Sequence, residues 1–185
     1  MSNNKRLFNM VIGAALLSTG TVASAANVNG GTVHFTGQLV NAACAVSADS
    51  SDQTVQLGQY RTARFAAVGD RSGLVPFTIK LEDCDTTVAT TAAVAFSGSA
   101  DANDPTLLAT SNIGGGTSGA ADGVGIEISD SKGKVLPPDG ATFSNTQTLN
   151  DGTNIVNLNA RYKSTKADVT PGQADADATF TMQYN

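Results

Sequence analysis

Hydrophobic and polar residues alternate along several short stretches of this chain, with the period of two that is typical of half-buried β-strands. The apolar residues rarely recur every third or fourth position, so helices are not expected after the first 25 residues. The clearest strands are predicted at 75–81, 124–128 and 156–162, with shorter candidates at 39–43, 54–57 and 93–96. Pro76 indicates a strand start or an edge strand. Six to eight short strands with polar, Gly-rich loops predict one antiparallel, all-β sandwich domain.

Both ends of the expected domain carry strand patterns that a self-contained sandwich does not need. At the C-terminal end Phe180, Met182 and Tyr184 alternate with polar residues up to the last position. Near the other end, Gly31, Val33 and Phe35 share one face of the stretch 27–37. A strand that is apolar on one face gains little alone, because it cannot bury that face by itself. We therefore expect residues 27–37 to need a groove in another molecule.

The first 25 residues have the three regions of a secretory signal peptide. Lys5 and Arg6 supply the positive charge, residues 11–17 form a short apolar run, and Ala23-Ser24-Ala25 provides the small residues before a cleavage site. The apolar run is shorter than the ~20 residues that span a bilayer. We expect residues 1–25 to be removed on export, which leaves 160 residues.

Charge and chemistry exclude several classes of function. The whole chain has a net charge of −5, and removal of Lys5 and Arg6 leaves nine basic against sixteen acidic residues, or −7. Such an acidic protein is not expected to bind nucleic acid. Cys44 and Cys84 are expected to form a disulfide in an oxidising compartment. His34 is the single histidine, so no metal site, catalytic constellation or cofactor is expected.

Glycine-rich residues 114–116 could suggest a phosphate-binding loop. That motif needs a strand before it, a helix after it and usually a Lys-Ser/Thr ending. The flanking sequence offers none of these. We interpret the run as a surface loop.

Several segments together resemble the major subunit of type 1 fimbriae, a family of the chaperone–usher pathway. The similarity covers essentially the whole chain after residue 25, and its segments agree in order and spacing. The final stretch also carries Gly172, fourteenth from the end, and a penultimate Tyr184, the pair that this family uses in its chaperone-recognition motif. The matching segments are Asn29–Phe35, Val40–Val46, Asp83–Asp85, Asp139–Phe143, Ala160–Tyr162 and Ala176–Tyr184.

The resemblance implies an incomplete immunoglobulin-like β-sandwich that lacks its last strand. It implies three parts: a signal peptide at 1–25, a donor-strand extension at 26–37 and a pilin domain at 38–185. A periplasmic chaperone would first fill the groove left by the missing strand. At an outer-membrane usher, the donor strand of an identical or related subunit would then replace the chaperone, giving a fibre on the cell surface that supports adhesion.

The resemblance also assigns roles to individual residues. Val33 and Phe35 would fill pockets in the neighbour, and Gly31 would sit where a side chain would clash with the neighbour's core. The edge of the acceptor groove, which also binds the chaperone, would consist of Phe180, Met182 and Tyr184, with Gly172 completing the recognition motif. Two alternatives remain open: a minor adaptor subunit of the same pathway, and a monomeric secreted sandwich that binds a ligand.

Overall fold

The structure is a computed structural model, and it describes residues 28–111, 113 and 119–185. The expected signal peptide and the glycine run at 114–116 lie outside the described residues. Contacts divide the chain into two units, Met1–Gln38 and Leu39–Asn185. In the first unit, residues 28–38 are exposed and contain no helix or strand.

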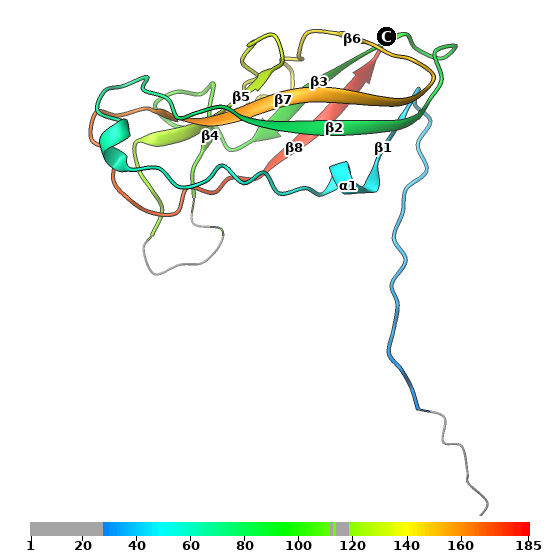
Figure 1. Ribbon diagram of the computed structural model, residues 1–185, viewed down its shortest axis with the longest axis horizontal. Coiled ribbons are helices and arrows are strands. Elements are labelled where there is room, and N and C mark those ends of the chain that lie inside the picture. The colour runs from blue at the N-terminus through cyan, green and yellow to red at the C-terminus, as the bar shows by residue number, and fades with distance from the viewer. Residues whose placement is uncertain (1–27, 112, 114–118) are drawn as a thin grey trace, which may run out of the picture. The chain divides into compact units, whose positions relative to one another are not determined.

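The second unit is nearly all β, as the alternating sequence predicts (Figure 1). Its two helical pieces are one turn each. The elements in chain order are β1 (Ala45–Val46), α1 (Ala48–Ser51), η1 (Thr62–Arg64), β2 (Val75–Cys84), β3 (Thr91–Gly98), β4 (Leu108–Ala109), β5 (Val124–Asp130), β6 (Gln147–Thr148), β7 (Gly152–Ser164) and β8 (Ala178–Tyr184).

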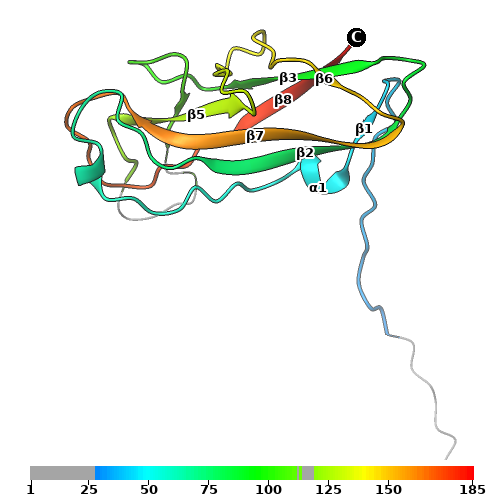
Figure 2. The ribbon, with the colours of Figure 1, turned by 45° about the horizontal axis from the view of Figure 1, so that its top comes forward.

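The strands form two antiparallel sheets that face each other across one core (Figures 1 and 2). One sheet has the order β1-β2-β7-β5-β4, and the other has the order β6-β3-β8. Side chains from both sheets meet between them, because each strand points alternate residues inward. Ile79 and Leu81 of β2, Val94 of β3 and Leu158 of β7 are almost completely buried there. This arrangement confirms the predicted sandwich.

Strand β7 is the long central element that positions both ends of the domain. It pairs with β2 from Val75↔Ala160 to Cys84↔Gly152, and with β5 from Val124↔Ser164 to Asp130↔Leu158. At ~3.3 Å per residue, its 13 residues span about 43 Å. Its first residues therefore mark one end of the domain and its last residues mark the other.

The predictions of two shorter strands, at 39–43 and 54–57, are wrong. Residues 39–43 contain no strand; the first pairing begins at Ala45, and Leu39 and Val40 remain exposed. Residues 54–57 also contain no strand, although Val55 and Leu57 are half-buried between exposed neighbours. Their alternation is real, but a strand also needs a hydrogen-bonded partner, and the described chain supplies none to this stretch. The edge position expected for Pro76 fits, because β1 pairs only with Leu81 and Glu82 of β2.

Candidate acceptor groove

Strand β8 is an open edge of the three-stranded sheet. It pairs with β3 along its whole length, from Ala92↔Tyr184 to Gly98↔Ala178. Among the described residues no strand pairs with its other edge. The second edge of β3, in contrast, is covered by β6 and by backbone bonds from Gly140 N to Phe96 O and from Ser144 N to Val94 O, each 2.8 Å. The unpaired groups of β8 can therefore accept one further strand.

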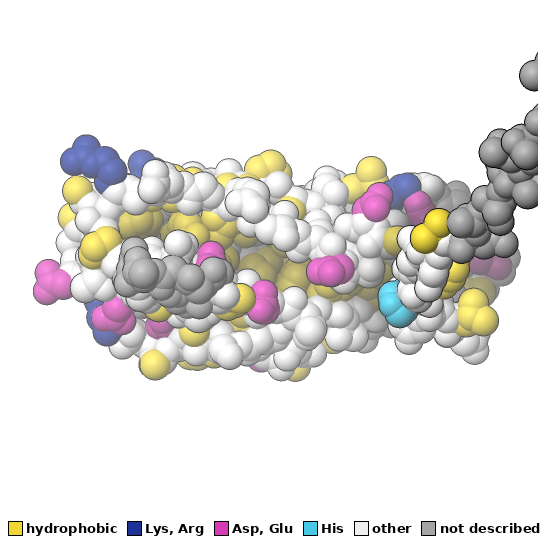
Figure 3. Space-filling model, turned by 90° about the horizontal axis from the view of Figure 1, so that it is seen from below, with side chains coloured by type: hydrophobic (Ala, Val, Ile, Leu, Met, Phe, Trp, Pro, Cys, Tyr) yellow, Lys and Arg dark blue, Asp and Glu magenta, His cyan; other side chains and the backbone are white. Residues whose placement is uncertain are grey.

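The inward side chains of β8 are only half-buried, which leaves apolar surface beside the open edge. Phe180, Met182 and Tyr184 pack against the core, while the alternating Thr181 and Gln183 are exposed. The Phe180 ring lies 6.4 Å from that of Phe96 in the core. In the view from below, Figure 3 shows a band of hydrophobic side chains in a hollow between polar ridges. Such a lining fits a strand with apolar residues at alternate positions.

Residues 53–60 have no strand partner, and we infer that they form the wall of the groove opposite β8. Leu57 in this segment packs against the core together with Phe77 of β2, and both are half-buried like the inward residues of β8. The segment has no backbone–backbone hydrogen bond among the described residues, and Gln53 alone is tied to β2, through Nε2 to Thr78 O at 3.2 Å. The alternation at 54–57 therefore marks a groove wall, which sequence reasoning took for a paired strand.

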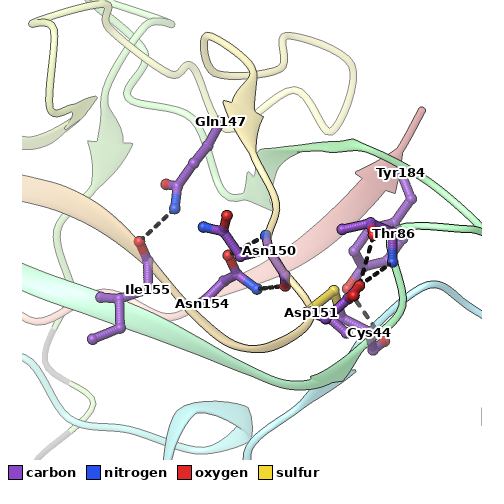
Figure 4. Close-up of a disulfide and its surroundings, with 9 residues drawn as sticks. Cys44, Thr86, Gln147, Asn150, Asp151, Asn154, Ile155 and Tyr184 are labelled. Atoms are coloured by element: carbon purple, nitrogen blue, oxygen red, sulfur yellow. Dashed lines mark hydrogen bonds between the residues drawn. A yellow bond between two sulfur atoms is a disulfide. The ribbon is translucent and has the colours of Figure 1, made fainter.

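The disulfide Cys44–Cys84 lies beside Tyr184 at the end of β8 (Figure 4). It joins the residue before β1 to the end of β2 across 40 positions of sequence, as predicted. The Tyr184 hydroxyl donates to the Cys44 carbonyl at 3.4 Å, and burial raises the pKa of Tyr184. Asp151, just before β7, accepts from the Thr86 amide at 2.8 Å. These contacts hold the last residue of β8 beside the start of the domain.

Gly172 lies far along the chain from this disulfide and has a steric reason to be glycine. A Cβ at this position would lie 2.5 Å from the backbone of Ala120 and Ala121. The neighbouring Gln173 accepts from the Ala121 amide at 2.7 Å and donates to Gly119 O at 2.9 Å. The structure therefore places Gly172 in a tight loop contact and not on β8. Its role in chaperone recognition stays a prediction.

The residues expected to form the donor strand are highly exposed. Val33 is 74% and Phe35 is 91% exposed, and neither belongs to the core. Gly31 has φ of +126° and its amide donates to the Asn29 side chain at 3.2 Å. Burial of Val33 and Phe35 by a partner would be favourable, because it removes their apolar surface from water.

The described residues contain no group of three or more His, Cys, Asp and Glu side chains that could hold a metal ion. No helix in the described part is long and apolar enough to cross a bilayer.

Comparisons with known proteins agree on one family. The family model for fimbrial proteins matches residues 33–185. The chain is 57% identical to a type 1 fimbrial subunit of Salmonella typhimurium, with 92% of this chain and 94% of the relative covered. It is 55% identical to the type-1 fimbrial protein A chain of Escherichia coli K12, with 92% of each covered.

Solved structures that share the fold include two from pili. One is a chaperone–usher pilus studied for the uncoiling of its rod, with TM-score 0.70 and 29% identity over 88% of this chain and all of that one. The other is PapA, the rod subunit of the P pilus, with TM-score 0.64 and 27% identity over 78% of this chain and all of that one.

Proposed function

Because this chain belongs to the fimbrial protein family and is a structural subunit of a surface fimbria, we propose that it polymerises by lending residues 26–37 to the groove of a neighbouring copy. The observation that carries this proposal is the open edge of β8 beside half-buried Phe180, Met182 and Tyr184. A strand from the neighbour would pair with that edge and cover the apolar lining at the same time.

The exposed N-terminal segment has the side chains that such a groove requires. In an extended strand, Val33 and Phe35 lie on one face while Thr32, His34 and Thr36 lie on the other. The apolar face would enter the groove and the polar face would meet water. Recognition by strand addition works in this way: backbone hydrogen bonds provide affinity, and alternate side chains in pockets provide specificity.

Side-chain sizes favour a donor strand that runs antiparallel to β8. The inward residues of β8 are Ala178, Phe180, Met182 and Tyr184, so the smallest of them is at the start of the strand. Along the donor the sizes increase from Gly31 to Phe35. In an antiparallel register with Phe35 beside Ala178, Val33 lies beside Phe180 and Gly31 beside Met182, so that the largest donor side chain meets the smallest side chain of β8. Parallel pairing over the same residues would set Gly31 beside Ala178 and Phe35 beside Met182, which leaves space at one end and crowds the other, and both faults are costly in a packed core.

An empty groove is a hazard before the neighbour arrives. An open strand edge with an apolar lining promotes aggregation. We propose that a periplasmic chaperone lends a strand to the groove after export directed by residues 1–25, and that Gly172 and Tyr184 contribute to its recognition. An outer-membrane usher would then exchange that strand for the donor segment of the next subunit. The subunit would reach the cell exterior in the fibre, with no cofactor and no catalytic role.

A peptide of residues 26–37 tests the proposed strand exchange. It would be added to a subunit that begins at residue 38, and thermal unfolding would be followed by circular dichroism. We expect the peptide to raise the melting temperature, because a ligand that binds only the folded state stabilises it. A His34→Ala peptide serves as the matched control and should work equally well, whereas a Phe35→Ala peptide should be much weaker. Equal effects of all three peptides, or none from any, would refute the assignment.

A further inference from the structure

Basic side chains gather at the end of the domain where β7 stops. After residue 25 the chain has nine basic residues, and six of them lie in two short stretches, 61–71 and 161–166. The stretches are neighbours, because Arg71 pairs with Lys163 in an antiparallel bridge. Arg64 Nε also donates to the Arg71 carbonyl at 3.2 Å. On the face seen in Figure 3 the Lys and Arg side chains lie mainly at the left end.

Three of these cations, Arg161, Lys163 and Lys166, are paired with local carboxylates, and Lys166 Nζ donates to Asp122 Oδ2 at 2.8 Å. Arg161 Nε donates to Glu127 Oε1 at 2.7 Å, and Lys163 Nζ donates to Asp104 Oδ2 at 2.8 Å. Glu127 is 2% exposed, so this part of the cluster holds the outer face of the sheet together.

The remaining arginines face solvent. Arg71 contacts Glu127 at 3.5 Å, and its side chain is still 45% exposed. Arg61 and Arg64 are exposed and form no ion pair within the described part of the chain. We call Arg61, Arg64 and Arg71 the arginine surface.

The arginine surface lies at one mouth of the acceptor groove. Arg61 directly follows the groove wall at 53–60. The Tyr60 ring lies 6.0 Å from that of Tyr162, and the Tyr162 hydroxyl donates to Ala174 O at 2.9 Å, four residues before β8 begins. The start of β8 and the arginine surface are therefore at the same end of the domain.

The opposite end is acidic. Asp83 and Asp85 flank Cys84 and are exposed, and Asp151 lies beside them through its bonds to Thr86. Lys80 is the basic residue near this group, and its ammonium pairs with Glu82. We call Asp83, Asp85 and Asp151 the acidic end. The disulfide fixes Cys44 at the same end, so this is also the end of the domain to which the N-terminal segment is attached.

These positions, together with the strand exchange proposed above, determine which ends meet in a fibre. An antiparallel donor strand has residue 37 near the start of β8, at the mouth with the arginine surface. The six residues 38–43 then lead to Cys44 of the donating copy, so that residue 37 and Cys44 are at most ~25 Å apart. The acidic end of the donor is thus tethered close to the arginine surface of the acceptor.

We propose that the arginine surface of each subunit binds the acidic end of the copy that donates its strand. The contact is between opposite charges at a solvent-exposed rim. Contacts of this type change the association rate and its dependence on salt more than the final affinity. They also favour the antiparallel direction of insertion, because the opposite direction would bring the acidic end of the donor to the acidic end of the acceptor.

A double-mutant cycle tests this contact in the full chain after removal of residues 1–25. One variant is Arg61→Gln with Arg64→Gln, and the other is Asp83→Asn with Asp85→Asn. Asparagine suits the acidic sites because it tolerates φ of 51° at position 83 and can still accept the bond from Thr87 at position 85. Lys132→Gln is the matched control, since Lys132 is an exposed cation on the turn after β5.

Polymerisation followed by light scattering is the readout, at low salt and at ~0.5 M NaCl. At low salt we expect each variant to polymerise about threefold to tenfold more slowly, and the combined variant to be no slower than either one. High salt should remove the difference, and Lys132→Gln should match the wild type. Additive losses, losses that persist in high salt, or an equal loss in Lys132→Gln would overturn the proposal. If the wild type itself fails to polymerise, the strand exchange is wrong and not this contact alone.

Discussion

Truncation of Phe35 should weaken the fibre without weakening the isolated subunit. Phe35 is 91% exposed in the subunit and contributes nothing to its core. An aromatic side chain that becomes buried removes about 200 Å² from water, which is worth roughly 4–5 kcal/mol as an upper estimate. The alanine variant keeps a small part of this, so we expect Phe35→Ala to cost about 3 kcal/mol at each subunit junction, in line with other Phe→Ala changes. That is roughly a 150-fold change in the equilibrium constant for strand insertion.

Two guanidinium titrations measure the effect of Phe35→Ala on the isolated subunit and on the fibre. The first follows the unfolding of the isolated subunit, where Phe35→Ala should match the wild type. The second follows the dissociation of preformed fibres, where the variant should dissociate at a distinctly lower denaturant concentration. His34→Ala changes the neighbouring residue on the other face and should leave both curves unchanged. A loss of subunit stability in Phe35→Ala would mean that Phe35 belongs to its own domain, and an unchanged fibre would remove it from the groove.

Three further predictions address the disulfide, the donor glycine and acid stability. Cys84→Ser opens a loop of 40 positions and should lower the free energy of unfolding by about 4 kcal/mol, with loss of surface fibres; normal fibres would show that the bridge is dispensable. Gly31→Arg should block polymerisation, because a buried charge is costly, while chaperone co-purification continues; fibres of normal length by electron microscopy would contradict this. Burial raises the pKa of Asp130, but bonds from Asn145, Lys134 and Lys132 outweigh it and lower the pKa below its usual value. The stabilisation from Asp130 is therefore present above the unfolded pKa of about 3.8 and is lost as pH falls through the lower folded value; Asp130→Asn should flatten the decline of unfolding free energy below pH ~4, and an unchanged decline would be evidence against it.

Local pattern was enough to find the strands that carry the core. Residues 75–81 and 156–162 alternate strictly because each lies in a sheet with one face on the core, and both appear as β2 and β7. The disulfide could also be predicted, since two cysteines in an exported chain leave one pairing. The error at 54–57 has a physical reason: alternation reports which face is buried, and it does not report whether the backbone has a partner. At 54–57 the side chains alternate but the backbone is unpaired, because the partner strand is missing.

Other features had no local signal. Glu127, on the outer face of β5, is buried by Arg71 and Arg161 from distant parts of the chain. Only the fold brings these residues together. The position of Phe77 beside the groove likewise depends on how far β1 extends along β2, which covers two residues only. Spacing in the sequence does not determine that length.

The most direct test of the whole account is removal of the donor segment from the gene. Cells would express the chain without residues 26–36, with the signal peptide retained, and their surfaces would be examined by electron microscopy with immunolabelling. We predict folded subunit in the periplasm and no filaments, because each groove would lack the strand that closes it. Filaments on these cells would contradict the account at its centre, since subunits would then be joining without the segment that carries Val33 and Phe35.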